Sequence, residues 1–425
     1  MKLPSLQHWL DWIMQQHVAF SPGARVGIRI QTVAEALNLT HFDCPVLMIA
    51  GTNGKGSTSA LVRSFYPGLS VGVYSSPHIH QFNERATISD HPFSDAEWML
   101  AFECVSESVS FKFSFFEFIT LAALVLFKQR KLDLLILEVG LGGRFDPVNV
   151  VNADVVVITS IALDHQAQLG HTREAIAYEK AGIFKPHCHA VIGDACPPEI
   201  VTEIARGVGV ESLYQIGVDF DCVLTDAQQS SCRYHNRLNE CGLKHLVMPT
   251  PHLKLSNLAA AICAAELLPL DLKQEAIING SADTRLPGRF ECWNQPHPLI
   301  FDVAHNEAAV GYLAQRLRTK GMRSILAVVA LKSDKCLPAL FSALTSSVTQ
   351  WYVASLNVPG GAAVGEILPL LSSEKCSNYQ TFASVSLALK EAIIDFKRSH
   401  VDAILVFGSF HAVQQAQCSL KQNSE

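Results

Sequence analysis

The residues most able to do chemistry in this chain lie in a glycine-rich stretch, AGTNGKGST at 50–58, between an apolar run and a segment of helical period. In a strand, loop and helix of this kind, backbone N–H groups and the helix N-terminus bind phosphate. Lys55 adds a positive charge, and Ser57 or Thr58 offers a hydroxyl to Mg²⁺. The stretch predicts a nucleoside triphosphate site formed by Thr52, Asn53, Gly54, Lys55, Gly56 and Ser57. The order of strand, loop and helix disfavours the alternative, a glycine-rich turn without a ligand.

A carboxylate at the end of another apolar run is the next candidate. Glu138 ends LILE at 135–138 and precedes a loop rich in glycine. A charge there needs a partner, and the alternative is an ion pair with an arginine. Because the phosphate loop belongs to the same predicted sheet, the hard oxygens of Glu138 favour Mg²⁺ coordination.

The elements around these residues alternate between strand-like and helical patterns. From about 45 to 192 this alternation predicts a mostly parallel, doubly wound sheet. The expected strands are 46–50, 71–74, 132–138, 154–159 and 189–192. Ligands bind beyond the carboxyl ends of such strands, so one crevice is expected to gather the phosphate loop, Glu138 and the segment 160–165.

The second half of the chain predicts an accessory sheet and then another domain. Irregular sequence at 217–251 favours a small antiparallel sheet, and a turn-rich segment at 281–290 indicates a domain boundary. Further strands are expected at 299–302, 325–330, 351–354 and 403–407. We therefore expect an α/β fold, with a P-loop parallel-sheet ATP-binding domain and small accessory sheet at 1–286, and a smaller Rossmann-like domain at 287–425.

Composition limits the classes of partner. The chain has 425 residues, of which 49% are hydrophobic, so it is long enough for two or three domains with full cores. Its net charge is −6 without a long run of one sign, and we expect no nucleic-acid partner. The 12 cysteines form no C-x-x-C pair, which favours reduced thiols in a cytoplasm, without disulfides or a zinc site.

Two apolar segments are expected to be helices, the first an amphipathic helix packed on the first domain and the second a buried helix. Leu6, Trp9, Leu10 and Ile13 recur at helical spacing, and this segment lacks the uninterrupted apolar core of a signal peptide. The longest apolar run, 118–127, is about half the length of a membrane span. We therefore expect no membrane partner.

Seven motifs in order resemble those of the Mur ligase superfamily, and within it the branch of dihydrofolate synthases and folylpolyglutamate synthases. The loop departs from the common G-x-x-x-x-G-K-[ST] pattern, because Ile49 stands at the first glycine position and Gly56 follows the lysine. It is similar instead to the G-T-N-G-K-G-[ST] loop of this family. The other motifs are YSSPH at 74–78, LDH at 163–165, EKAGI at 179–183, SNLAA at 256–260, PGRF at 287–290 and DVAHN at 302–306.

The resemblance implies metal ligands and catalytic residues. His165 resembles a Mg²⁺ ligand, Ser76 resembles a serine that reaches a metal ion, and Lys180 resembles a lysine that is carbamylated near a second metal. The implied metal ligands are Ser57, Ser76, Glu138, His165 and Lys180, and the implied catalytic residues are Lys55, Glu138, His165 and Lys180. The implied cofactors are ATP and Mg²⁺ at two sites, and a monovalent cation such as K⁺ stays open as a further one.

The resemblance also implies nucleotide contacts beyond the loop. Arg289 matches an arginine suited to forked bonds with phosphate, Asp302 is placed to accept bonds from ribose hydroxyls, and His305 is expected near the phosphates. These elements are expected to close over ATP and keep water out. Asn257 matches an asparagine that contacts the base, and the alternative is an ordinary helix N-cap.

Three further segments resemble those that hold dihydropteroate in the bifunctional bacterial enzymes. They are a loop with Gly27, Ile28 and Arg29, a helix start with Phe115, Phe116 and Glu117, and a loop with Phe145, Asp146 and Pro147. Phe116 is expected to stack on a pterin and Asp146 to pair with its amino-pyrimidine edge. Core packing is the alternative for the two phenylalanines. The chain departs from the family pattern at Phe145 and Pro147, and the first loop is shortened near Ile28.

The implied function is that of an ATP-dependent ligase of folate biosynthesis and one-carbon metabolism. It would add L-glutamate to dihydropteroate and to the γ-carboxyl of reduced folates through an acyl phosphate, as a cytoplasmic monomer. A folylpolyglutamate synthase without the first activity is the alternative within the branch. A peptidoglycan-precursor ligase is disfavoured because no extra domain precedes the phosphate loop. A P-loop phosphotransferase or NTPase without amide formation would need only the first domain, and the motifs around Arg289 and Asp302 count against it.

Overall fold

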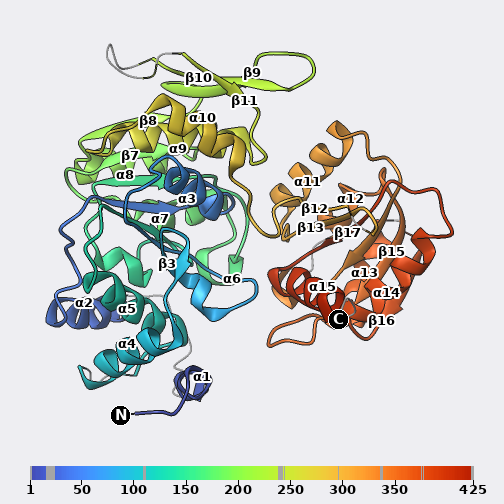
Figure 1. Ribbon diagram of the computed structural model, residues 1–425, viewed down its shortest axis with the longest axis horizontal. Coiled ribbons are helices and arrows are strands. Elements are labelled where there is room, and N and C mark those ends of the chain that lie inside the picture. The colour runs from blue at the N-terminus through green and yellow to red at the C-terminus, as the bar shows by residue number, and fades with distance from the viewer. Residues whose placement is uncertain are drawn as a thin grey trace. The chain divides into compact units, whose positions relative to one another are not determined.

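The protein divides into two compact units, Met1–Thr284 and Arg285–Glu425, which are described separately (Figure 1). The computed structural model describes residues 2–15, 24–108, 112–237, 243, 245–294, 296–335, 338–374, 376 and 378–422, with side chains from 28 onward in the second of these ranges. Each unit has its own sheet with helices on both faces, so the expected α/β architecture is confirmed.

An eight-stranded sheet forms the centre of the first unit. Its strand order is β4-β3-β2-β5-β1-β6-β7-β8, with parallel pairing from β2 to β8 and antiparallel pairing of β3 and β4. Because β1 lies between β5 and β6, the segment that follows it starts in the middle of the sheet's carboxyl edge. The strands are β1 (Val46–Ala50), β2 (Val71–Tyr74), β3 (Ala86–Ile88), β4 (His91–Pro92), β5 (Leu134–Glu138), β6 (Val155–Ile158), β7 (His189–Ile192) and β8 (Ser212–Gln215).

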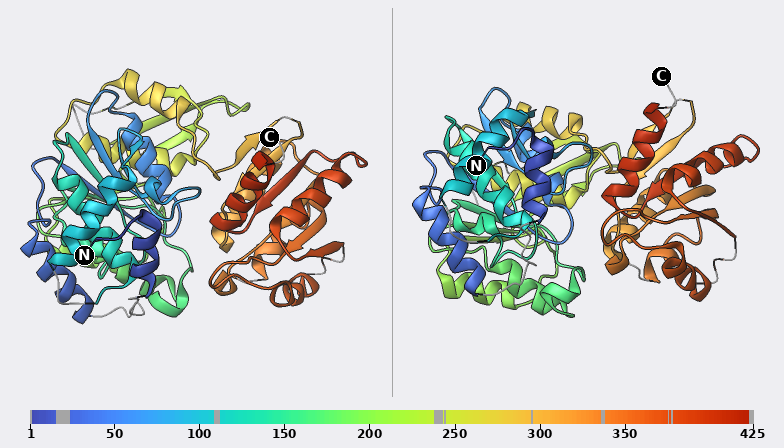
Figure 2. Two further views of the ribbon diagram at one scale, coloured as in Figure 1. Left: turned by 60° about the horizontal axis from the view of Figure 1, so that its bottom comes forward. Right: turned by 90° about the horizontal axis from the view of Figure 1, so that it is seen from below.

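Helices cover both faces of this sheet because its central strands are apolar on both sides. Every residue of β1, β5 and β6 is buried, as expected for parallel strands between two helical layers. Figure 2 shows these layers from two further sides. One face packs on α3 (Lys55–Ser64) and α9 (Leu255–Leu267), and the other packs on α4 (Asp95–Glu107), α5 (Phe115–Lys128), α7 (Arg173–Ala181) and α8 (Ile200–Val208).

The remaining helices of this unit are α1 (Leu6–Gln15), α2 (Ala24–Ala36), η1 (Phe82–Arg85), η2 (Pro147–Val150), α6 (Gln166–Leu169) and α10 (Gln274–Asp283). The apolar run 118–127 is buried throughout as part of α5. Ser114 caps this helix, because its hydroxyl accepts the N–H of Glu117 and the Glu117 carboxylate accepts the N–H of Ser114. None of the helices in the described ranges has the length and apolar character needed to cross a membrane.

The accessory sheet has three antiparallel strands in the order β11-β10-β9 and lies over α9 and α10 (Figure 1). Its strands are β9 (Phe220–Leu224), β10 (Ser231–Asn236) and β11 (Leu246–Pro249). Glu266 on α9 accepts hydrogen bonds from the hydroxyl of Tyr234 at 2.6 Å and from the side-chain amide of Asn236 at 3.1 Å. These bonds fix β10 to the helix.

The second unit is also doubly wound. Its six strands have the order β12-β13-β17-β14-β15-β16, and only β12 is antiparallel to its neighbour. They are β12 (Glu291–Trp293), β13 (Leu299–Asp302), β14 (Ile325–Val329), β15 (Val348–Ala354), β16 (Tyr379–Phe382) and β17 (Ala403–Phe407). One face packs on α14 (Val385–Phe396) and α15 (Phe410–Gln422), and the other on α11 (Glu307–Thr319), α12 (Ala339–Ser342) and α13 (Val364–Ser373), with η3 (Ser333–Lys335) in a connection.

The sequence misses the short edge strands and misplaces one segment. The residues of β16 are largely exposed and β4 has only two residues, so neither shows the apolar run that marks a strand. The loop expected at Gly27, Ile28 and Arg29 is wrong, because these residues lie within α2. The buried residues Ile30, Val33 and Ala34 give this segment its helical period, and the surroundings of Gly27 lie outside the described residues.

The different burial of two leucines on α14 predicts that their alanine variants differ greatly in the free energy of unfolding. Leu389 is 1% exposed and Leu387 is 52% exposed. We expect Leu389→Ala to lower the free energy of unfolding by about 2–5 kcal/mol, because it leaves a cavity in the core. Leu387→Ala is the matched control and is expected to change it by less than about 0.5 kcal/mol. Urea unfolding of both variants measures this, and equal losses would contradict the packing described.

Candidate functional site

The glycine-rich loop connects β1 to α3 at the carboxyl edge of the sheet. Gly51 and Gly54 have φ angles of +144° and +103°, which favour glycine. A Cβ atom on Gly51 would lie 1.9 Å from Oγ1 of Thr159, and one on Gly54 would lie 2.4 Å from Oδ1 of Asn257. Both positions therefore need glycine, because the backbone runs directly against the end of β6 and the start of α9.

Hydrogen bonds from the segment after β6 hold this loop. The N–H of Thr52 donates to the carbonyl of Ser160 at 2.6 Å, and the N–H of Asn53 donates to the Ser160 hydroxyl at 3.2 Å. The Thr159 hydroxyl donates to the carbonyl of Asn53 at 2.8 Å. Lys55 folds back over the loop and donates to the carbonyl of Gly51 at 3.0 Å. The protein itself therefore sets the shape of the loop.

The first turn of α3 faces Glu138 at the end of β5. Glu138 is buried, and its Oε2 lies 3.6 Å from the position that a Cβ of Gly56 would take. Ser57, on the same turn, is 5% exposed, whereas Thr58 is fully buried. Of the two hydroxyls, that of Ser57 is therefore the one open to a ligand.

Lys180 lies buried near the end of α7, within electrostatic reach of the phosphate loop. The pKa of Lys180 is lowered to about 7, mainly by burial and also by the positive charge of Lys55, while Asp164 and Asp146 act in the opposite direction. At pH 7 about half of such an amine carries no charge. Lys180 therefore combines a buried position with a neutral nucleophilic nitrogen.

His165 stands at the start of α6, one residue after the buried Asp164. Its backbone has φ of 48°, and its N–H donates to Oδ1 of Asp164 at 2.8 Å. Because Asp164 is among the charges that act on Lys180, the LDH and EKAGI motifs lie on the same side of the first unit. The structure thus brings Lys55, Glu138, His165 and Lys180 to one edge of the sheet.

Sequence analysis missed two residues, Asp194 and Arg173, that bind the backbone of the segment after β6. Asp194 accepts the N–H of Ile161 at 2.8 Å and pairs with Arg173 at 3.2 Å. Arg173 also donates to the carbonyl of Ile161 at 2.9 Å. Asp194 follows β7 closely, so the rule that found Glu138 could have found it. Arg173 lies in an ordinary helical pattern and carries no such signal.

Asn257 lies in the first turn of α9 with its side chain against Gly54. The N-cap of α9 is Lys254, so the alternative of an ordinary N-cap role for Asn257 is wrong. Its exposed fraction is 8%. The side chain is therefore placed to contact both the loop and a ligand bound there.

The three segments expected to hold a pteridine meet at the loop after β5. An Nη atom of Arg29 lies 2.8 Å from Oε1 of Glu117, which joins α2 to the start of α5. The Phe116 ring covers Gly140, since a Cβ there would lie 2.3 Å from the ring. The N–H of Gly140 in turn donates to Asp146 at 2.9 Å. Arg29, Phe116, Glu117 and Asp146 are thus brought together.

The buried carboxylate of Asp146 fixes the loop after β5 by accepting hydrogen bonds from its backbone N–H groups. Its carboxylate also accepts the N–H of Leu141 at 3.0 Å and that of Val148 at 3.1 Å. Burial raises the pKa of Asp146 to about 6, and these backbone N–H groups act in the opposite direction. Below about pH 6 this carboxyl group is therefore mostly protonated, which changes the bonds it can offer to a ligand.

The other members of these segments differ in exposure. Phe115 and Phe116 pack against the core and keep part of their surface exposed, so neither shows the complete burial that core packing alone predicts. Ile28 is 68% exposed. Phe145 is half-buried, and Pro147 is buried as the first residue of η2.

A second cluster lies in the C-terminal unit. Asp302 at the end of β13 accepts the N–H groups of Phe290 and Ala304, each at 2.8 Å. The guanidinium of Arg289 lies over the Phe410 ring at 5.1 Å, and the His305 ring lies 6.4 Å from the same ring. The structure therefore groups Arg289, Asp302 and His305 within this unit.

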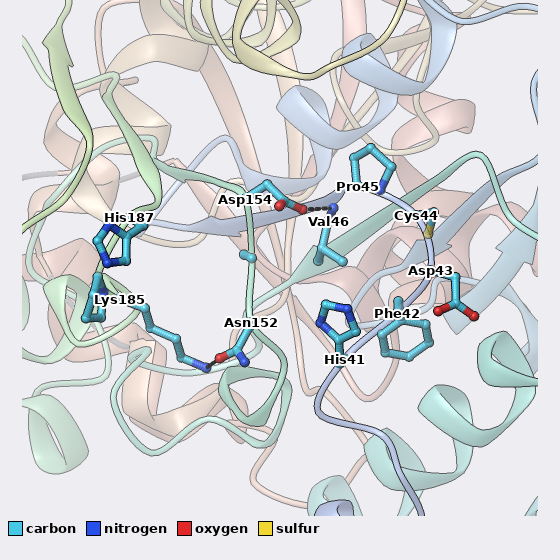
Figure 3. Close-up of a pocket in the computed structure, with 12 residues that line it drawn as sticks. His41, Phe42, Asp43, Cys44, Pro45, Val46, Asn152, Asp154, Lys185 and His187 are labelled. Carbon is cyan, nitrogen blue, oxygen red and sulfur yellow. Dashed lines mark hydrogen bonds between the residues drawn. The ribbon is translucent and has the colours of Figure 1, made fainter.

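A separate cavity of about 670 Å³ opens at the amino ends of β1 and β6 (Figure 3). Two of its charged groups are bonded to the backbone: Asp154 accepts the N–H of Val46 at 2.7 Å, and Lys185 donates to the carbonyls of Asn149 and Val151. Ligands of such sheets bind at the opposite, carboxyl edge. The cavity therefore lies away from the predicted chemistry.

The oxygen donors near the loop fit Mg²⁺. Within the described ranges, no three His, Cys, Asp or Glu side chains gather as a metal cluster. Mg²⁺ does not need one, because it keeps several waters and binds through one or two carboxylates and substrate phosphates. Glu138 beside the first turn of α3, with Ser57 on that turn, supplies oxygen ligands of this kind.

Alanine variants of Gly54 and Gly68 distinguish the effect of a steric contact beside the phosphate loop from the effect of backbone strain alone. Gly54 and Gly68 both have positive φ, but only Gly54 has a neighbour, Asn257, where a Cβ would stand. Both alanine variants should lose about 1–2 kcal/mol of stability through backbone strain. Gly54→Ala is also expected to weaken ADP binding at least tenfold in calorimetry, whereas Gly68→Ala should bind ADP as the parent does. Equal ADP affinities would contradict the role given to Gly54.

Known proteins match along nearly the whole chain. The Mur ligase middle domain matches residues 49–265, and the Mur ligase glutamate ligase domain matches residues 288–410. The dihydrofolate synthase/folylpolyglutamate synthase of Escherichia coli K12 is 37% identical over 96% of this chain and 94% of its own.

Solved structures of two relatives are similar to this structure. E. coli FolC in complex with DHPP and ADP has a TM-score of 0.92 and 34% identity, and the match covers 99% of each chain. The bifunctional enzyme from Yersinia pestis, complexed with AMPPNP and Mn ion, has a TM-score of 0.88 and 36% identity over 98% of each chain. The chain therefore belongs to the Mur ligase family, in the branch of dihydrofolate synthase/folylpolyglutamate synthase.

Proposed function

We propose that this protein is an ATP-dependent amide ligase that joins L-glutamate to dihydropteroate, forming dihydrofolate, and to the γ-carboxyl of reduced folates. The observation that carries this proposal is the gathering of the phosphate loop, Glu138 and Lys180 at one sheet edge, next to the pteridine segments. The choice of substrates is supported by the name of the E. coli K12 relative, dihydrofolate synthase/folylpolyglutamate synthase, and by the DHPP and ADP bound in the E. coli FolC structure. We further propose a cytoplasmic monomer.

The reaction has two steps. An oxygen of the substrate carboxylate attacks the γ-phosphorus of ATP, so that ADP leaves and an acyl phosphate forms. The amine of glutamate then attacks the acyl carbon, phosphate leaves, and an amide bond forms. Bound Mg²⁺ would neutralise the negative charge that develops on phosphate oxygens.

The residues of the first unit have distinct proposed roles. The N–H groups of the loop and Lys55 bind the phosphates, and Asn257 contacts the base. Ser57, Ser76, Glu138 and His165 would hold Mg²⁺, and two metal sites are proposed. Phe116 would stack on the pterin ring, while Arg29 and Asp146 would bind polar groups of the same substrate.

Carbamylation of Lys180 is part of the proposal. The neutral Nζ attacks carbon dioxide, an N–C bond forms, and a proton leaves, which gives an anionic carbamate. The pKa of about 7 supports this step, because the charged amine is not a nucleophile. The carbamate would be the ligand that Lys180 offers to the second metal.

The C-terminal cluster completes the proposed assignment. Arg289 is suited to forked bonds with phosphate, because a guanidinium presents paired N–H donors. Asp302 and His305 are proposed to contact the ribose and the phosphates. In a P-loop NTPase without amide formation, substitutions at these three residues would leave turnover unchanged.

Substrate dependence tests the function. We expect phosphate release from ATP and Mg²⁺ only when glutamate is present with dihydropteroate or with tetrahydrofolate. Release with tetrahydrofolate alone would leave a folylpolyglutamate synthase. Release without glutamate or pteridine would contradict amide ligation. Phosphate measured by a coupled assay, with the amide product identified by mass, distinguishes these results.

Lys180→Ala tests the carbamate. We expect it to remove most of the turnover and to leave ATP affinity within about threefold, because its proposed role is in the second metal site rather than in phosphate binding. Lys185→Ala is the matched control, because Lys185 is half-buried and, among the described residues, its bonds go to two backbone carbonyls and Asn152. It should lower stability and retain turnover. Full turnover of Lys180→Ala would remove the second-metal proposal.

A further inference from the structure

Arg85 is a buried cation that none of the motifs uses. It ends η1, and 8% of its surface is exposed. Its carbonyl accepts the N–H of Ser75 at 2.9 Å, and the next residue pairs with Tyr74 across β2 and β3. Arg85 therefore stands where the loop 75–85 leaves the sheet and returns to it. This loop carries Ser76 and His78.

Two adjacent charged residues hold this loop. The Glu84 carboxylate accepts the N–H groups of Ile79, His80 and Gln81 at 2.8, 2.9 and 2.7 Å. Arg85 Nε donates to Nδ1 of His78 at 2.9 Å. Because Nδ1 accepts this bond, it carries no proton, and the ring proton of a neutral His78 lies on Nε2. The bond therefore fixes both the position and the tautomer of His78.

The charge of Arg85 is balanced by groups on neighbouring strands. Burial lowers the pKa of Arg85, while Tyr74, Glu138 and Glu84 oppose this change. Tyr74 ends β2 and Glu138 ends β5, and these two strands are paired. A buried guanidinium is stable only with such partners. Arg85 thus belongs to the loop that carries Ser76 and lies within electrostatic reach of the carboxylate of Glu138.

We propose that Arg85 is a positioning residue of the ligase reaction, which holds Ser76 and Glu138 in the arrangement that binds metal and nucleotide phosphates. It acts through its bond to His78 and its charge beside Glu138. This inference rests on the proposed function. A lysine keeps the charge but cannot reproduce the directed Nε–H bond of a planar guanidinium. The identity of the residue therefore matters beyond its charge.

Arg85→Lys, His78→Ala and the double variant test this inference. The control is Arg130→Lys, because Arg130, like Arg85, lies over an aromatic ring, at 5.6 Å, yet is exposed and pairs with Glu97 at the surface. We expect Arg85→Lys to lower kcat at least tenfold with the KM for glutamate within twofold. Both single changes break the same hydrogen bond between Arg85 and His78. The kcat of the double variant should therefore be no lower than that of the more impaired single variant.

A measurement without turnover accompanies the kinetics. Mn²⁺ with AMPPNP is expected to raise the melting temperature of the parent and of Arg130→Lys, and to raise that of Arg85→Lys by less than half as much. If Arg85→Lys does not fold, His78→Ala must show the reduced kcat and the reduced shift by itself. A purely structural role would lower the melting temperature without changing kcat of the folded enzyme.

Three results would overturn the inference: a parental kcat in Arg85→Lys, a parental Mn²⁺ and AMPPNP shift in that variant, or losses that multiply in the double variant. Failure of the proposed function would look different. In that case the parent itself would form no amide. The shift in melting temperature with Mn²⁺ and AMPPNP could still be compared between Arg85→Lys and Arg130→Lys.

Discussion

The close approach of the phosphate loop to its neighbours is the constraint on which the site depends. Gly51 touches the end of β6 and Gly54 touches the start of α9, so one short loop joins the middle of the sheet to the helical layer that covers it. The bonds from Thr159 and Ser160 then fix the direction of its N–H groups. Without glycine at these two positions the strand, the loop and the helix could not meet.

Buried charge is the second common feature of this edge. Glu138, Asp146, Lys180 and Arg85 all lie almost entirely out of water. Each is tied to a backbone N–H, a neighbouring side chain or an opposite charge, as burial of ionisable groups requires. Burial, and after it the positive charge of Lys55, lowers the pKa of Lys180 to about 7, so that a large fraction of its amine is neutral near pH 7.

Sequence predicts the parts of this protein that depend on neighbours along the chain. The strands β1, β2, β7, β13 and β17 have the bounds expected from their apolar runs, and the accessory sheet lies where irregular sequence indicates it. The fold class could therefore be predicted. β16 could not, since an exposed edge strand shows no apolar pattern. The segment at Arg29 was predicted as a loop from the resemblance alone, whereas its buried residues follow a helical period.

Residues whose partners are distant in sequence were missed. Thr159 binds Asn53, Asp194 binds Ile161 and Arg173, and Arg85 lies beside Glu138 only because β2 and β5 are neighbours in the sheet. Sequence motifs identify the residues expected to bind a ligand. The residues that position those side chains can be identified only from contacts in the folded structure. This is why the site residues were easier to propose than their supports.

The helix α9 connects the phosphate loop to the accessory sheet. Asn257 contacts Gly54, and Glu266, nine residues later, binds Tyr234 and Asn236. Nine residues turn a helix through about 900°, so the two contacts lie on opposite sides. An inserted or deleted residue between them would rotate one contact by about 100° away from its partner. In this chain, the accessory sheet and the phosphate loop therefore both depend on the nine-residue spacing along α9.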